Sequence, residues 1–379
     1  MKPFDSVVRV SGSDVGDAEI QAIKSVFDRN YLGMGSDVQE FEATLGEYFG
    51  RDVVCVSTGT AALHLAVQCA GVGAGDEVLV PSLTYVASFQ AISATGATPV
   101  SVDVLADSMT MDPIDLDKKV TSRSKAVMPV YYGGGISNLQ QIRSIAYKSD
   151  LIVIEDAAHA FGSRVDGELV GASGDISCFS FDPIKNLTSG EGGCVVSSDS
   201  RFLDGVRDAR LLGVQGDSRA RNTERRLYEY DVKDQGWRYH MSNINAAIGK
   251  SQFLAFPERA AKRQELASTY DSIFEEHSTI QTLPNDYTQI VPHIYVVRFS
   301  SSEVRDHVRS RLLEDLNVET AIHWYPNHFL SRFRDESGTL GVTEDVYSRM
   351  LTLPLHTRLS ADQISTIANH VVHLTSSLI

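Results

Sequence analysis

The chain has 379 residues, of which 42% are hydrophobic and 22% charged, and these values predict an ordinary globular enzyme with a large and a small domain. The net charge of −15 argues against nucleic acid as the main partner, because binding to phosphate backbones requires a basic surface. No run reaches the ~18–20 apolar residues of a membrane span, and residues 1–17 lack the apolar core of a signal peptide, so we expect a cytoplasmic protein. The four cysteines show no C-x-x-C spacing, and we expect no metal site.

Two helices joined by a loop are expected before the first strand. Apolar residues recur at helical spacing in 15–27 and again in 38–49. Between them lies NYLGMGSD (30–37), whose glycines and terminal Asp37 predict a loop that leads into a helix start. From the residues alone, this segment could be no more than a connector with a helix cap.

Residues 53–70 predict a strand, a turn and a helix. VVCV (53–56) is a short apolar run, STGT (57–60) is a turn of small residues, and helix-forming residues begin at Ala61. A helix that starts from such a turn presents free backbone amides and the positive end of its dipole, which suit a phosphate. Serine and threonine also cap helices that bind no ligand, so both interpretations stay open.

Further buried strands are expected at 77–81, 98–104 and 126–130. Tyr85 follows the first of them closely, where its ring could stack on a flat ligand or could simply be half-buried. After the third, YYGGGISNLQQI (131–142) leads into a helix.

Two short strands bring an acid and an amine toward the same edge of the predicted sheet. Ligands of open α/β sheets lie outside the carboxyl ends of the strands, and the apolar run 151–154 leads directly to Asp156. The run 176–181 delivers Ser180 to that edge and is followed by a loop that contains Lys185. This pair suits a pyridine cofactor, because the acid can keep the ring nitrogen protonated and the amine can form a Schiff base with an aldehyde. Asp156 could instead cap a helix, and Lys185 could be a solvated loop lysine.

The last part of the chain predicts a second, smaller α/β unit. A charged surface stretch in 201–250 leads to WRYHMSNINAAIG (237–249), and a long helix is expected from Pro257 to His277. The elements expected beyond it are strands at 292–299 and 318–325, a helix at 304–316, and a terminal helix that Ser360 caps.

Three of these segments together resemble the DegT/DnrJ/EryC1/StrS family of sugar aminotransferases. The segments are DAAHAFGS (156–163), GDISCFSF followed by KNLTSGEGG (174–193), and WRYHMSNINAAIG. The similarity extends from about Val15 to the C-terminus. It implies a pyridoxal phosphate (PLP) enzyme of the aspartate aminotransferase-like α/β fold (fold type I). It also implies a large PLP-binding domain at 1–250 with a mixed, mostly parallel sheet, a smaller α/β domain at 251–379, and a homodimer with shared active sites.

The resemblance also implies roles for individual residues. Lys185 would form the Schiff base with PLP, and Asp156 would face the ring nitrogen. Gly59, Thr60, Ala61 and Ser180 would bind the phosphate, Tyr85 would cover the ring, and His159 would lie near the phenolic oxygen. Either Arg238 or His240 would reach the partner chain's phosphate, and the substrate would lie near Tyr31, Gly33 and His323.

The activity implied is amination of a nucleotide-linked keto sugar. We expect a 4-keto-6-deoxy sugar with glutamate as amino donor, and a 3-keto sugar or a keto-cyclitol is the alternative. A regulatory or binding protein that keeps the fold is the non-enzymatic alternative, which Lys185 and Asp156 disfavour. Some members of the family that this chain resembles have histidine in place of the lysine and are dehydratases, and Lys185 argues against that branch. The run Gly133–Gly135 departs from the family pattern, in which a single glycine is usual near this position.

Overall fold

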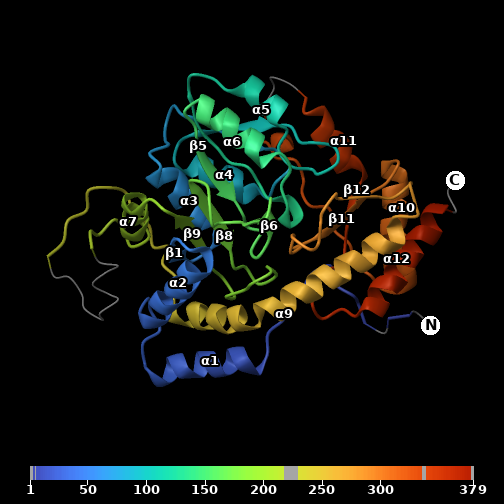
Figure 1. The fold of residues 1–379 in the computed structure, drawn as a ribbon, viewed down its shortest axis with the longest axis horizontal. Coiled ribbons are helices and arrows are strands. Elements are labelled where there is room, and N and C mark those ends of the chain that lie inside the picture. Colours follow the sequence, from blue (N-terminus) through green and yellow to red (C-terminus); the bar gives the residue numbers. More distant parts are fainter. Residues whose placement is uncertain (1–2, 5, 217–228, 335–338, 377–379) are drawn as a thin grey trace.

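The large sheet of the protein has seven strands in the order β1-β9-β8-β5-β4-β2-β3. The computed structural model describes residues 3–4, 6–216, 229–334 and 339–376, so part of the charged stretch in 201–250 lies outside the described residues (Figure 1). The five strands from β8 to β3 are parallel, whereas β9 pairs antiparallel with both β8 and β1. This mixed, mostly parallel sheet confirms the predicted fold class. Its strands are β1 (Asp52–Val56), β2 (Glu77–Pro81), β3 (Thr98–Val102), β4 (Ser124–Val127), β5 (Ile152–Asp156), β8 (Ile176–Ser180) and β9 (Gly193–Ser197).

The two faces of the sheet are covered by different helices, because side chains alternate along each strand. In β8, Ile176 and Cys178 pack on the face of α3 (Gly59–Cys69) and α7 (Ser200–Ala209), while Phe179 packs on the opposite face with α2 (Ser36–Phe49). Both faces are therefore buried, which is why these strands are continuous apolar runs in the sequence. The other helices around this sheet are α4 (Val86–Ala94), α5 (Pro113–Lys119) and α6 (Leu139–Lys148).

A single long helix, α9 (Asn243–Phe274), connects the region of the large sheet with the C-terminal elements (Figure 1). The prediction that this helix starts at Pro257 is wrong. It starts after Ser242, whose hydroxyl accepts a hydrogen bond from the Asn245 amide. A proline inside a helix removes one hydrogen bond and bends it, and Figure 1 shows a change of direction between the yellow and orange halves of α9. The expected domain boundary at residue 250 falls inside α9, and the division into two domains stays a prediction.

The C-terminal elements form a second hydrophobic core around a three-stranded antiparallel sheet. The prediction of a strand at 318–325 is wrong, because this segment forms only two isolated bridges, from Val318 to Val8 and from Ala321 to Thr352. The strand next to β11 is β12, whose segment had not been predicted as a strand. Ser360 caps the last helix as predicted, since its hydroxyl accepts a hydrogen bond from the Gln363 amide. The elements are β10 (Gln281–Thr282), β11 (Tyr295–Arg298), β12 (Met350–Leu353), α10 (Ser302–Leu316), α11 (Gly341–Arg349) and α12 (Ala361–Ser376).

The N-terminal helix α1 (Asp17–Asp28) packs along α9 (Figure 1). Within the described ranges, no helix is long and apolar enough to cross a membrane.

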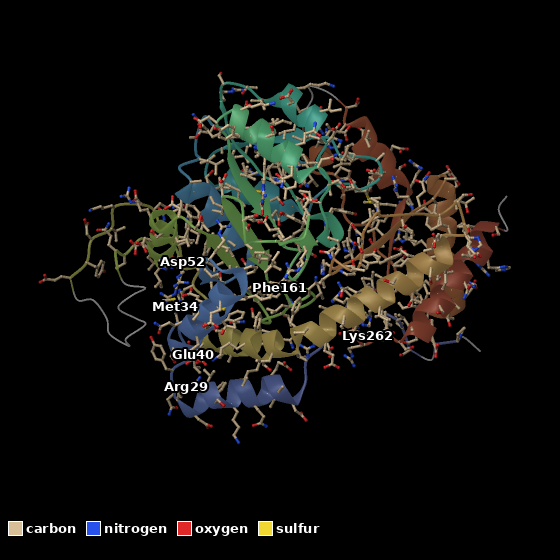
Figure 2. The ribbon with its side chains drawn as sticks, in the orientation of Figure 1. Arg29, Met34, Glu40, Asp52, Phe161 and Lys262 are labelled. Carbon is tan, nitrogen blue, oxygen red and sulfur yellow. The ribbon has the colours of Figure 1, made fainter. Side chains whose placement is uncertain are left out.

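A cluster of aromatic rings fixes the chain that follows β5. Phe161 lies between the sheet and α9 (Figure 2). Its ring centroid is 4.9 Å from that of Phe256 and 5.9 Å from that of Phe179. Both pairs are edge-to-face, the geometry that aromatic pairs prefer. Because Phe161 follows Asp156 by five residues, this packing holds the segment that carries the predicted acid.

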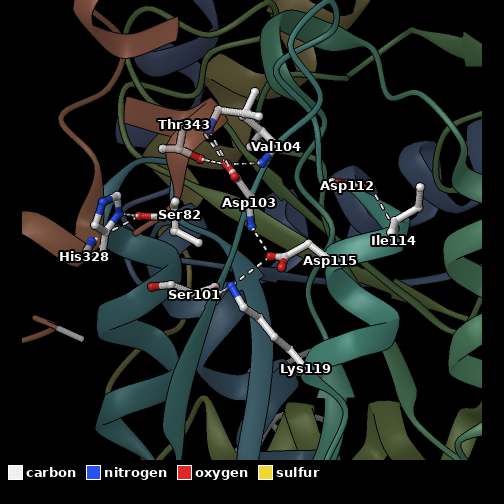
Figure 3. A network of polar contacts seen from close by, with 12 residues as sticks. Ser82, Ser101, Asp103, Val104, Asp112, Ile114, Asp115, Lys119, His328 and Thr343 are labelled. Carbon is white, nitrogen blue, oxygen red and sulfur yellow. Dashed lines mark hydrogen bonds and ion pairs between the residues drawn. The ribbon is translucent and has the colours of Figure 1, made fainter. Parts of the chain in front are cut away.

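A second set of contacts fixes the C-terminal elements to the edge of the large sheet (Figure 3). Asp103 follows β3, and its carboxylate accepts hydrogen bonds from the backbone amides of Val342 and Thr343 at 3.1 and 2.7 Å. A carboxylate at the first turn of a helix satisfies amides that lack an intrahelical partner. The Asn327 side-chain amide also donates to the carbonyls of Ser82 and Thr84, at 3.0 and 2.8 Å. These bonds place residues 323–329 beside the chain that follows β2.

Replacing Asp103 with alanine is expected to lower the free energy of unfolding by about 1–3 kcal/mol, because the amides at the start of α11 lose their acceptor. Chemical denaturation of the holoprotein measures this change. Asp117, which is exposed on α5, provides the control, and its replacement with alanine should change stability by less than about 0.5 kcal/mol. Equal stabilities of the two variants would contradict the role given to Asp103.

Candidate active site

A cavity of about 500 Å³ lies at the carboxyl ends of β5 and β8. Asp156 is the last residue of β5 and Ser180 the last of β8, so both reach the cavity from neighbouring strands. The cavity brings together most of the predicted site residues, namely Gly59, Thr60, Tyr85, Asp156, His159, Ser180, Lys185 and His323. A further cavity of about 550 Å³ between α3 and α7 contains none of the predicted site residues.

Asp156 is a buried acid with a fixed orientation. Its side chain accepts a hydrogen bond from the Ser88 hydroxyl at 2.7 Å and another from the Ala158 amide at 3.2 Å. Burial raises the pKa of this carboxyl above its ordinary value, and the two hydrogen bonds and Lys185 oppose that rise. A cationic group placed beside Asp156 would favour its ionised form. The site is therefore suited to a ligand that carries a positive charge at this point.

Lys185 lies in a tight turn immediately after β8. Its backbone amide donates to the Asp182 carbonyl at 3.1 Å, and the Asp182 carboxylate accepts from the Ile184 amide at 3.1 Å. Burial of the amine lowers the pKa of Lys185 to about 8, although Asp182 and Asp156 act in the opposite direction. A large fraction of Lys185 is therefore neutral near pH 8, which is the form in which an amine acts as a nucleophile or base.

This value of the pKa predicts how capture of PLP by the apoprotein depends on pH. Only the neutral amine reacts with an aldehyde, so the capture rate should rise ~10-fold per unit as pH approaches 8 from below, and flatten above it. Absorbance after rapid mixing measures the rate. An increase that continues beyond pH 10 would contradict the lowered pKa, because an ordinary lysine titrates there.

The start of α3 forms a cradle of backbone amides beside Ser180. Thr58 caps this helix, and its hydroxyl accepts from the Ala61 amide at 3.0 Å, so the amide of Ala61, a predicted phosphate ligand, is already occupied. Among the described residues, the amides of Gly59 and Thr60 have no hydrogen-bond acceptor. A helix start with free amides is a site for an anion.

Gly59 is needed for the close approach of α3 to β8. A Cβ atom at this position would lie 2.7 Å from the Ser180 Cβ. We therefore expect Gly59→Ala to raise the dissociation constant for PLP at least ~10-fold, because the cradle must open to accept the methyl group. Titration of the apoprotein with PLP measures the constant. Gly12→Ala is the control, since a Cβ at Gly12 meets no atom within 4 Å. Equal constants for both variants would contradict this account.

Three histidines surround Lys185. The rings of His159 and His293 lie 4.3 Å apart, and the His293 Nε2 is 3.4 Å from the Lys185 Nζ. The His323 Nδ1 lies 2.9 Å from the Thr352 hydroxyl. Burial lowers the pKa of His159 and His293 well below the ordinary value and that of His323 to about 4, so all three rings are neutral. His293 lies within the strand predicted at 292–299 and was not among the predicted site residues.

Aromatic rings form the mouth of the cavity. The ring centroids of Tyr85 and Trp324 are 4.9 Å apart, and 54% of Tyr85 is exposed. Trp324 reaches this position because the contacts of Asn327 hold its segment beside Thr84. A flat ligand inside the cavity would lie next to Tyr85.

Besides Ala61, which does not line the cavity, four predicted residues lie outside it in the single chain. Tyr31 and Gly33 contact the start of α9, where their carbonyls accept from the side chain and the backbone amide of Asn243 at 3.0 and 3.1 Å. The other two lie on a segment that bridges to neighbouring strands and loops, with Arg238 opposite Leu211 and His240 opposite Val56.

These residues fit pyridoxal phosphate. The free amides of α3 suit its phosphate, the buried Asp156 suits a protonated ring nitrogen, and the amine of Lys185 suits its aldehyde. In the part of the chain that the structure describes, no cluster of three or more His, Cys, Asp or Glu residues could hold a metal ion.

Comparison with known proteins points to the same chemistry. The sequence model of the DegT/DnrJ/EryC1/StrS aminotransferase family matches residues 13–372. The chain is 31% identical to the spore coat polysaccharide biosynthesis protein SpsC of Bacillus subtilis, over 94% of each protein. It is 35% identical to the GDP-perosamine synthase of Escherichia coli O157:H7, over 93% of this chain and 94% of that protein. The fold is similar to that of Spr1654 from Streptococcus pneumoniae in its PLP form, with a TM-score of 0.90, 27% identity, and 98% and 100% of the two chains covered.

Proposed function

We propose that this chain, which belongs to the DegT/DnrJ/EryC1/StrS aminotransferase family, transfers an amino group from glutamate to a nucleotide-linked 4-keto-6-deoxy sugar. The family and the relatives show that it is a PLP-dependent sugar aminotransferase. The observation that carries this proposal is the meeting of Asp156 and Lys185 in one cavity beside the free amides of α3. When bound, PLP supplies an electron sink for negative charge that develops on the carbon next to nitrogen.

Asp156 would keep the ring nitrogen of the cofactor protonated. Its carboxylate is held in place by Ser88 and by the Ala158 amide. In a buried site, a carboxylate beside a protonated nitrogen stabilises the positive charge far more than it could in water. Gly59, Thr60 and Ser180 would bind the phosphate, and Tyr85 would cover the ring.

Lys185 would bind the cofactor covalently and then act as base and acid. Once an amino donor displaces it, its neutral amine at Nζ can accept a proton from the donor's α-carbon and deliver a proton to the neighbouring carbon of the cofactor. The pKa of about 8 favours this exchange, because the amine can be neutral before the transfer and protonated after it. The same residue would act in reverse when the keto sugar is aminated.

The mouth of the cavity supports a sugar nucleotide as substrate. Tyr85, of which 54% is exposed, and the partly buried Trp324 present aromatic rings to the cavity, which suits a sugar that has both apolar faces and hydroxyl groups. The E. coli relative is named a GDP-perosamine synthase, which supports a nucleotide-linked sugar here as well. His323 would face the sugar, and Tyr31 and Gly33 would lie on the substrate side of the site.

We further propose that two chains form each active site. Arg238 and His240 lie outside the cavity of their own chain, and their segment runs beside the end of β1, where α3 begins. Either side chain could then donate a hydrogen bond to the phosphate bound by a partner. Sedimentation that finds single chains at micromolar concentration would contradict this arrangement.

A two-step discharge experiment tests the substrate. The PLP enzyme is first converted by glutamate to its amino form and freed of glutamate, and nucleotide-linked 4-keto-6-deoxy and 3-keto-6-deoxy sugars and a keto-cyclitol are then added separately. We expect the 4-keto sugar to restore the original absorbance at least ~10-fold faster than the other two, because only one ketone position can reach the amine of the cofactor. Faster discharge by the 3-keto sugar or the cyclitol would overturn the proposed substrate and leave the aminotransferase activity intact.

A further inference from the structure

The segment 290–293 lies directly against the turn that carries Lys185. His293 is 3% exposed, and its Nε2 is 3.4 Å from the Lys185 Nζ. Its other ring nitrogen, Nδ1, is buried and has no partner among the described residues. A buried imidazole with one nitrogen next to the reactive amine can act on that amine in addition to packing in the core.

Side chains from three separate parts of the fold hold this segment in place. The Asn186 side-chain amide donates to the Val291 carbonyl at 3.0 Å, and the Ser163 hydroxyl accepts from the Val291 amide at 3.0 Å. Arg263 of α9, itself buried, donates to the His293 carbonyl at 3.3 Å. Because Asn186 is the neighbour of Lys185, the lysine and the histidine are tied together through the backbone as well as through their side chains.

The unusual run Gly133–Gly135 allows this approach. The Gly133 carbonyl accepts from the His293 amide at 3.1 Å. Gly134 has a φ of 113°, and a Cβ atom there would lie 2.7 Å from the Val291 carbonyl oxygen. A side chain at Gly134 would therefore push the segment, and His293 with it, away from Lys185.

We propose that His293 is a positioning residue for Lys185, whose free amine it holds by accepting a hydrogen bond at Nε2. This inference rests on the proposed role of Lys185. Neutral imidazole can accept at Nε2 when its proton is on Nδ1. An amine that donates one N–H to Nε2 has its lone pair directed away from the histidine. The amine is then oriented before it takes a proton from the donor's α-carbon, and orientation of this kind contributes strongly to rate.

The groups around His293 keep its ring neutral, as it must be to accept a hydrogen bond from the Lys185 amine. The titratable and charged groups that face it are Lys185, His159, Arg263 and His323, and burial together with these groups lowers the pKa of His293 well below its ordinary value. A protonated imidazole could not accept a hydrogen bond from the amine, so neutrality is a condition for the proposed function.

Single-turnover kinetics of the PLP holoenzyme with glutamate test the proposal. In His293→Leu, which keeps bulk and removes the acceptor, loss of the cofactor absorbance should be ~10–100-fold slower. The deuterium isotope effect with α-deuterated glutamate should increase, because proton transfer then limits the rate. His293→Gln places an oxygen near the former Nε2 position and should recover most of the rate. His356→Gln is the matched control, since His356 is also buried with an unpartnered Nδ1, and it should behave as wild type.

A purely structural role for His293 predicts a different outcome. His293→Leu and His293→Gln would then be slowed equally with an unchanged isotope effect, or not slowed at all, and either result would overturn the inference. If His293→Leu does not fold, His293→Asn replaces it, because the shorter amide stays polar but cannot reach the amine, and it should be slow in the same way. A wild-type enzyme whose absorbance glutamate leaves unchanged would refute the proposed function itself, and with it this inference. If glutamate removes the absorbance of the wild type and the His293 variants react at the wild-type rate, only the inference about His293 is refuted and the proposed function stands.

Discussion

Replacing Lys185 with alanine is expected to lower the rate of transamination at least ~10³-fold. Lys185 provides both the covalent link to the cofactor and the base that moves the proton, and the described residues of the cavity include no other lysine. Steady-state turnover of glutamate with a keto sugar measures the loss. A small primary amine added to the variant should restore part of the rate, because it can enter the space left by the side chain and accept the proton.

Lys250→Ala is the control for this substitution. Lys250 forms a surface ion pair with Glu40, and its loss should leave turnover within about twofold of wild type. A Lys185→Ala variant that retained more than a tenth of the wild-type rate would contradict the proposed role.

Replacing Asp156 with asparagine is expected to lower turnover by about 10²–10³-fold. The amide has nearly the same shape, so packing is preserved, but it carries no negative charge to stabilise a protonated ring nitrogen. Because the proton on that nitrogen makes the ring an electron sink, the slow step should be proton removal from the donor. Turnover and the isotope effect with α-deuterated glutamate measure both consequences.

Asp175→Asn provides a matched control on the same pair of strands. Asp175 precedes β8 and so lies at the opposite edge of the sheet from Asp156, where it accepts a hydrogen bond from the Val153 amide. Its replacement should leave turnover nearly unchanged. Equal losses in the two variants would mean that Asp156 acts through the stability of the strands and not through the cofactor.

The location of the site could be predicted from the sequence because residues that directly follow parallel strands meet at the same edge of the sheet. An apolar run that ends in Asp156 and another that ends near Ser180 must bring these residues to one edge once the strands pair. Tyr85, Gly59 and Thr60 follow strands in the same way, and all of them line the cavity. The family resemblance then supplied the cofactor, which agrees with the geometry.

What the sequence did not predict depends on contacts between distant segments. His293 reaches Lys185 only because Gly133, Asn186 and Arg263 hold its segment, and no periodicity in the chain reports such contacts. The start of α9 was predicted wrongly because proline is common in the first turn of a helix, and Pro257 was therefore taken as the first residue. In the structure Pro257 lies inside α9, and the helix continues on both sides of it. The strand β12 was not predicted because its four residues, Met350–Leu353, form too short an apolar run to identify a strand without knowing that it pairs with β11.

The most direct test of the account is the visible absorbance spectrum of the PLP-loaded protein before and after glutamate. For wild type, the account predicts a band that glutamate removes, and borohydride should fix one cofactor per chain to Lys185. The Lys185→Ala variant should fix none. A wild-type protein that shows no such band in the presence of PLP, or a band that glutamate does not change, would contradict the claim that Lys185 and Asp156 form a transaminase active site.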